Sequence, residues 1–210
     1  MPSKNVQSRD HKFSIIERGI MLQLISQGLK RKTLAIFGVL LFCTTSIFGQ
    51  ATTIYKVNNW KNFRSIQGNC TVSLPSSPEH VKQVMPFPEQ GYNLRYDVYV
   101  SAFEKKAVYM MLIAEYPPFI NESYAELSLE SFLNGIVTQN VNNKLIFADL
   151  TEVQGHKALD FFIEAKGVYF KGRAIMSKNY LYLLAMECEM KNYLEDHYKH
   201  FIGSFNLDLK

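Results

Sequence analysis

The chain has 210 residues, of which 47% are hydrophobic and 20% charged, a composition typical of a globular protein. Its formal net charge of +4 belongs to the N-terminal part: removing the seven basic and two acidic residues that precede Thr52 from 23 and 19 leaves 16 basic and 17 acidic residues. Such a balanced domain lacks the clustered cationic side chains that attract nucleic acid, so we exclude nucleic-acid binding.

Residues 1–27 form a polar lead with little hydrophobic periodicity, which we expect to be disordered. This lead is long for a segment that precedes an export signal, so both Met1 and Met21 are candidate start positions.

Residues 28–51 have the three-part order of an export signal. A basic cluster, an apolar run and a pair of small residues follow one another along the chain. Because lysine and arginine resist crossing a membrane, the apolar run enters the bilayer as a loop. Gly49 and Ala51 occupy the small-residue positions that a signal peptidase recognises, which predicts cleavage after Ala51. The basic residues are Lys30, Arg31 and Lys32.

Two other interpretations of this segment stay open. Residues 33–49 could remain as an uncleaved inner-membrane anchor, although a spanning helix needs about 20 apolar residues, or they could form a buried helix. Lipidation is disfavoured because Phe42, a large residue, precedes Cys43. Cleavage predicts a periplasmic or secreted protein, and membrane contact through the N-terminal segment alone.

The rest of the chain fits one domain. We interpret residues 52–68 as an N-terminal extension and residues 69–210 as a single folded unit. This part contains Cys70 and Cys188, and an oxidising compartment would permit a disulfide between them. We favour the alternative of two buried thiols on neighbouring strands.

Alternating apolar and polar residues predict about seven strands. Short turns with Gly or Asn separate the last four, which indicates consecutive hairpins and an antiparallel meander. The predicted strand segments are residues 69–78, which end in a proline-rich turn, and residues 92–104, 107–118, 144–153, 157–165, 168–176 and 180–190.

Two helices are predicted. Residues 123–143 begin with Ser123 and Glu126, the spacing of a capping box, and continue with an apolar stripe. Residues 192–205 offer Asn192 as the cap, with Glu195 three residues later. The predicted fold class is therefore α+β, a mostly antiparallel meander sheet with two helices packed on it. The stripe is Leu129, Phe132, Leu133, Ile136 and Val137.

This order of elements resembles the PsbP-like family, which includes the extrinsic P subunit of photosystem II and exported bacterial proteins. The resemblance covers residues 69–207, and its motifs are short. It is carried by Pro75, Gly155, Phe161, Gly172, Arg173, Leu181, Tyr182, Ser204 and Phe205. It implies the fold and, by analogy with assembly factors and protein-binding modules in the family, a non-enzymatic role. The resemblance brings no shared catalytic set and no metal ligands to this chain.

Few residues suggest chemistry. His197 and His200 share a helical face and are weak zinc candidates, because a site needs three or four converging ligands. A solvated helix face is the simpler interpretation. The sequence has neither a Gly-x-Ser-x-Gly elbow nor a glycine-rich phosphate loop, so we expect no cofactor. Trp60, the only tryptophan, either packs on the domain or contacts a partner.

We therefore expect an exported binding or assembly module whose partner is another protein of the cell envelope. Two alternatives stay open. A hydrolase would have a deep pocket where polar groups converge, and a small-ligand carrier would have an empty apolar cavity.

Overall fold

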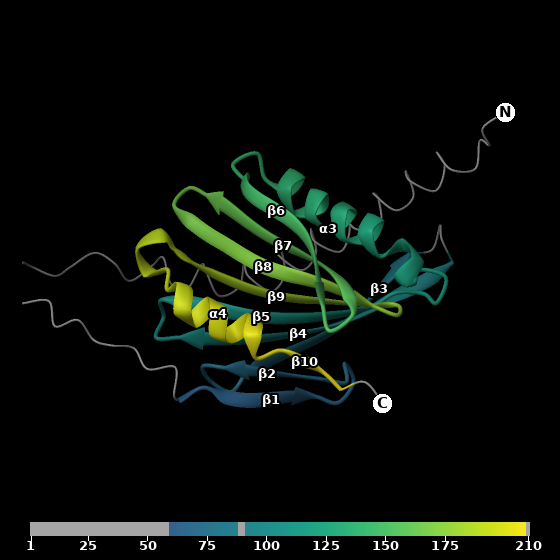
Figure 1. The fold of residues 1–210 in the computed structure, drawn as a ribbon, viewed down its shortest axis with the longest axis horizontal. Helices are drawn as coiled ribbons and strands as arrows, with labels where there is room; N and C mark the ends of the chain where they lie inside the picture. The colour runs from purple at the N-terminus through teal and green to yellow at the C-terminus, as the bar shows by residue number, and fades with distance from the viewer. Residues whose placement is uncertain (1–58, 88–90, 209–210) are drawn as a thin grey trace, which may run out of the picture.

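The computed structural model describes residues 59–87 and 91–208 (Figure 1). The helices are α3 (Ala125–Gln139) and α4 (Glu195–Gly203), with short 3-10 turns η4 (Glu122–Tyr124) and η5 (Met190–Asn192) before them. The strands are β1 (Lys61–Ser65), β2 (Cys70–Leu74), β3 (Glu79–Phe87), β4 (Tyr92–Phe103), β5 (Ala107–Glu115), β6 (Lys144–Val153), β7 (His156–Ala165), β8 (Val168–Ser177), β9 (Tyr180–Glu189) and β10 (Asn206–Leu207).

The strands form two antiparallel sheets. The larger has seven strands in the order β3-β4-β5-β9-β8-β7-β6, so two runs of hairpins meet where β5 pairs with β9. The smaller has the order β1-β2-β10. With its two helices this is the predicted α+β fold, and the last four strands are the predicted meander.

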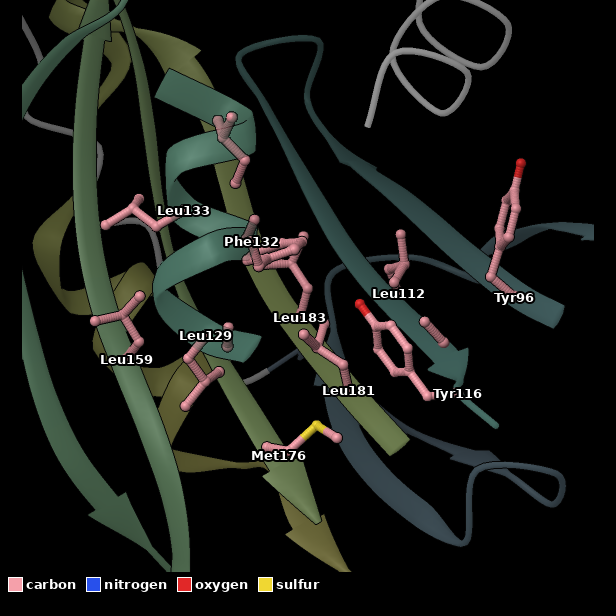
Figure 2. Packing of buried hydrophobic residues seen from close by; sticks show 14 of the residues in the cluster. Tyr96, Leu112, Tyr116, Leu129, Phe132, Leu133, Leu159, Met176, Leu181 and Leu183 are labelled. Carbon is pink, nitrogen blue, oxygen red and sulfur yellow. The ribbon is translucent and has the colours of Figure 1, made fainter. Parts of the chain in front are cut away.

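Helix α3 covers one face of the large sheet. Its buried residues include Leu129, Phe132 and Leu133, which point toward the strands in Figure 2. They pack against residues of β7 and β9 such as Leu159 and Leu183. The predicted stripe is therefore confirmed as the core-facing side of the helix, and this burial is its main source of stability.

Helix α4 and the small sheet cover the opposite face. Tyr198 and Phe201 of α4 share a core with Val72 of β2 and with Met111 and Leu184 of the large sheet. Strand β10 follows α4 and pairs with β2, so the C-terminal segment fastens the small sheet in place.

The sheet composition differs from the prediction in two ways. Residues 70–74 form a strand as expected, but it belongs to the small sheet. The seventh strand of the large sheet is β3, where Pro86 interrupts the alternating pattern and hides the strand from sequence analysis. The short strands β1 and β10 were also not predicted. A two-residue strand such as β10 and a short, mostly polar strand such as β1 give little periodic signal.

Both predicted helix caps are wrong. The side chain of Asn121, not Ser123, accepts a hydrogen bond from the backbone N–H of Ser123 at 3.0 Å, which caps η4 ahead of α3. Asn192 lies in η5, and α4 begins after Leu194 without a side-chain cap. In both cases a short 3-10 turn precedes the α-helix and moves its start a few residues along the chain.

Candidate binding surface on the outer strands

Strand β6 is one edge of the large sheet and is exposed along most of its length. It pairs with β7, its one strand neighbour in the described chain, and an irregularity interrupts this pairing between Leu145 and Phe147. Four large apolar side chains of β6 are 40–48% exposed: Leu145, Ile146, Phe147 and Leu150. A long edge strand with exposed apolar residues favours pairing with another chain.

Next to this edge, a group of aromatic rings lies on β6, β7 and β8. It is on the same face of the large sheet as α4. Phe147 lies directly across from Phe162 of β7, with ring centroids 6.1 Å apart. Phe162 in turn contacts Tyr169 of β8 at 4.8 Å and stacks on Tyr193 at 6.1 Å. We call the exposed and half-buried part of this face the outer-sheet surface, formed by Phe147, Asp149, Asp160, Phe162, Tyr169, Lys171 and Arg173.

Lys171 joins the outer-sheet surface to α4. Its ammonium nitrogen lies 4.4 Å from the ring centroid of Tyr198 and 5.4 Å from that of Tyr193, distances at which a cation is attracted to an aromatic face. It also forms a salt bridge with Glu195 at 3.1 Å and donates to the Tyr193 hydroxyl at 2.8 Å. Lys171 is thus held in place and fixes the surface against the helix.

The same contacts change two acid–base equilibria. Burial, followed by the hydrogen bond to Glu195, raises the pKa of Tyr193. That hydrogen bond from Tyr193, together with Lys171, lowers the pKa of Glu195. The tyrosine stays neutral and the carboxylate stays ionised at neutral pH, so the Lys171–Glu195 pair persists there.

A row of charges crosses the outer-sheet surface next to the aromatic rings. Arg173 of β8 donates to both carboxylate oxygens of Asp160 on β7, at 2.5 and 2.7 Å. The hydrogen bond to Asp160 raises the pKa of the Arg173 guanidinium. Directly across from Asp160 on the edge strand lies Asp149, which is exposed and has no cation within salt-bridge distance in the described chain. The row ends at the edge with two like charges facing each other.

His156 lies in a second polar cluster at the turns of the sheet. Its Nδ1 is 3.1 Å from Oε1 of Glu122, and its Nε2 is 3.3 Å from Oγ of Ser177. The Glu122 oxygen also accepts from the backbone N–H of Lys178 at 2.9 Å. Hydroxyl, imidazole and carboxylate therefore stand in the order that serine hydrolases use.

The surroundings of this cluster favour a structural role. Ser177 is only 4% exposed, and neither of two nearby hollows is lined by it or by His156. One hollow, of about 520 Å³, is lined by Glu122, Ser123, Ala125, Glu126, Leu127, Glu130 and Lys157. The other, of about 360 Å³, is lined by Pro118, Asn121, Glu122, Lys178 and Asn179. The cluster ties two hairpin turns to the start of α3, and most of the residues that line the two hollows are polar or charged.

The two cysteines are free, buried thiols in different sheets. Cys70 lies on β2, with its sulfur 3.8 Å from that of Met111, and Cys188 lies on β9. The expectation of neighbouring strands is therefore wrong, although burial is confirmed. Desolvation raises the pKa of Cys70 to about 12 and that of Cys188 to about 11, so both stay protonated and unreactive at neutral pH.

One of the two histidines of α4 departs from the predicted solvated face, and the other lies on it. His197 is only 3% exposed and contacts the rings of Phe103 and Trp60, at 4.8 and 5.7 Å. His200 is exposed, and its Nε2 lies 3.2 Å from Oγ of Ser73. In the described chain no group of three or more His, Cys, Asp or Glu residues is placed to hold a metal ion.

Trp60 packs at the edge of the same region. Its ring meets those of Tyr109 at 4.7 Å and His200 at 5.3 Å, and it is partly buried against the α4-side core. The structure places it in the packing role that the sequence allowed. The targeting residues Lys30, Arg31, Lys32, Gly49 and Ala51 lie outside the described residues. Within residues 59–87 and 91–208, no helix combines the length and apolarity needed to cross a membrane.

Comparison with known proteins shows similarity of fold. The solution structure of cyanobacterial PsbP (CyanoP) from Synechocystis sp. PCC 6803 matches 76% of this chain and 98% of its own, with 10% identity and a TM-score of 0.48. A Pseudomonas aeruginosa protein of unknown function, described as a putative regulator, matches 64% of this chain and 85% of its own, with 10% identity and a TM-score of 0.35. A Bacteroides thetaiotaomicron structure matches 72% of this chain and 50% of its own, with 10% identity and a TM-score of 0.38.

One of these similar structures is a PsbP, from the family that the sequence resembles, and at these identities the similarity concerns the fold alone. No family model matches the sequence, and no curated protein matches it.

Sequence reasoning did not find the outer-sheet surface. Its residues look like the polar side of ordinary strands, and their meeting depends on the register of β6, β7 and β8. One signal was available: the run Leu145-Ile146-Phe147 places apolar residues on both faces of its strand.

Proposed function

We propose that this chain is an exported, non-enzymatic binding module that engages another protein of the cell envelope through β6 and the outer-sheet surface. The observation that carries the proposal is the exposure of four large apolar side chains on one edge strand. Such a strand offers backbone hydrogen bonds for affinity and side-chain positions for selectivity.

The neighbouring surface fits the same role. Aromatic rings and an arginine next to an apolar strand are side chains that protein interfaces favour. Lys171 and Glu195 hold this surface to α4, so it is organised before a partner arrives, which reduces the entropy lost on binding.

Site-specific photocrosslinking tests the binding role. A photoreactive benzoylphenylalanine replaces Leu150 on β6 or, as a control, Ile66, which is 83% exposed on the far side of the molecule in the β1–β2 turn. In the native host we expect a defined protein adduct from position 150 and none from position 66. Equal adducts at both positions, or none at 150, would contradict the proposal.

Export is proposed from the targeting pattern of residues 28–51. N-terminal sequencing of the mature protein should begin at Thr52. An intact N-terminus on protein recovered from the cytosol would overturn export but not binding.

A further inference from the structure

Within the described residues, the bulge-free part of β6 pairs with a strand on one side only, that of β7. Residues 147–153 pair regularly with β7 and contain neither proline nor a basic residue. Charged side chains (lysine above all), prolines and bulges are the usual devices that protect a sheet edge. The charges of residues 147–153 are the acidic Asp149 and Glu152, which repel an acidic strand and attract a basic one. In β6, Lys144 and the irregularity between Leu145 and Phe147 lie together at the beginning of the strand. The stretch from Phe147 onward is therefore the β6 edge to which a partner strand has access.

The charge row indicates what such a strand should carry. Arg173, Asp160 and Asp149 are direct cross-strand neighbours on β8, β7 and β6. Two like charges opposite each other destabilise a strand pair, whereas opposite charges stabilise it. Arg173 already directs two hydrogen bonds to Asp160, so it does not neutralise Asp149. A cation on an added strand, directly across from Asp149, would complete the row.

The flanking residues specify the rest of the pattern. Phe147 shares the face of Asp149, because their partners Phe162 and Asp160 alternate with the buried Phe161 on β7. Leu150 lies across from Leu159, on the α3 side. A complementary strand therefore has a basic residue opposite Asp149 and apolar residues opposite Phe147 and Leu150.

We propose that the β6 edge binds an extended segment of a partner protein as an added strand, with a lysine or arginine opposite Asp149 and apolar residues on either side of it. This partner chemistry rests on the proposed function. A second copy of this chain fits less well, because residues 147–153 carry no basic residue to place opposite Asp149.

A designed peptide tests the proposal on the full chain. The probe is a fluorescently labelled peptide, TTTVKVI, whose lysine faces Asp149 when the peptide lies antiparallel to residues 147–153. Its charge-reversed counterpart is TTTVEVI. Fluorescence anisotropy measures binding of both peptides to the wild type and to the Asp149→Lys and Asp149→Asn variants. Asp149 is exposed, so these variants should fold.

We expect the wild type to prefer the lysine peptide and Asp149→Lys to reverse that preference, with changes of about tenfold, while Asp149→Asn shows little preference. Leu150→Arg should abolish binding of both peptides. Equal affinity of the two peptides for all variants, or no binding at all, would overturn the proposal. So would a wild-type dimer, seen by sedimentation, that Leu150→Arg dissociates. A partner adduct at position 150 without this charge dependence would leave the proposed function standing.

Discussion

The two edges of the large sheet differ in what the edge strand places next to a carboxylate of its neighbouring strand. At one edge, β4 carries Asp97 next to the edge strand β3. His80 of β3 donates a 2.6 Å hydrogen bond to Asp97, and its ring stacks on Tyr99. At the other edge, the second strand in carries Asp160, and the edge strand β6 opposes it with another carboxylate, Asp149. Within residues 59–87 and 91–208, the carboxylate beside the β3 edge is paired by that edge strand, whereas Asp149 at the β6 edge has no cation within salt-bridge distance.

The two edges also differ in their backbones. Both expose apolar side chains, among them Val81 and Val84 on β3, but β3 contains Pro86 and Lys82, which hinder an incoming strand. Strand β6 has no such residue between Phe147 and Val153. Both edges expose apolar residues, so in the described chain β6 is distinguished by the lack of lysine and proline after Lys144 and by a carboxylate, Asp149, without a paired cation.

The largest effect should come from breaking the charge row. Arg173→Leu removes the two hydrogen bonds to Asp160 and leaves this partly buried carboxylate facing Asp149. The free energy of unfolding, measured by urea titration, should fall by about 2 kcal/mol. The loss should be smaller in an Asp149→Asn background, because the repulsion is then absent.

Lys191→Leu is the matched control for this change. Its pair with Glu189 is exposed on both sides, so the substitution should change stability by no more than about 0.5 kcal/mol. If Arg173→Leu cost the same with and without Asp149, the two carboxylates would not be coupled and the contrast between the edges would weaken.

A smaller effect on stability should follow from replacing Glu187, a carboxylate on a central strand of the large sheet. Glu187 lies on β9, and burial raises its pKa above the ordinary 4.5. The folded protein then binds more protons than the unfolded chain above pH 4.5, so this group makes stability fall as pH rises through that window.

Glu187→Gln should therefore raise the melting temperature at neutral pH and flatten the decline in stability above pH 4.5. Asp149→Asn, on the exposed edge, should raise the melting temperature by less at the same pH values, because the carboxylate it faces, Asp160, is already paired with Arg173. Thermal melts in a series of buffers compare the two variants. A melting temperature for Glu187→Gln that falls at pH 7 would show that the carboxylate is stabilised by its surroundings.

Much of the fold could be predicted because its periodic signals are local. The stripe from Leu129 to Ile136 and the alternation along strands such as β7 specify which sides of these elements are buried. Strand β3 was missed because Pro86 is typical of a turn in isolation, and its place at an edge is what makes the proline acceptable.

The candidate site was less predictable, because it depends on contacts between distant residues. Ser177, His156 and Glu122 come from three separate segments, and no spacing in the chain announces their contact. Asp149 looks like an ordinary polar strand residue until the register places it opposite Asp160. Charge pairing across strands is a property of the register, and a single sequence constrains the register only weakly.

The smallest effect should come from removing the blocking residue of β3. Pro86→Thr restores a backbone N–H on an exposed edge, so the free energy of unfolding should change by less than about 0.5 kcal/mol. Combined with Leu150→Arg, which closes the β6 edge, it should allow weak binding of the peptide TTTVKVI at β3. Val84→Thr in the same background keeps the proline and should not bind. If neither variant bound the peptide, Pro86 alone would not be what closes that edge, and Lys82 and the neutralised Asp97 would remain as explanations. Binding by Val84→Thr would show that the β3 edge is already open.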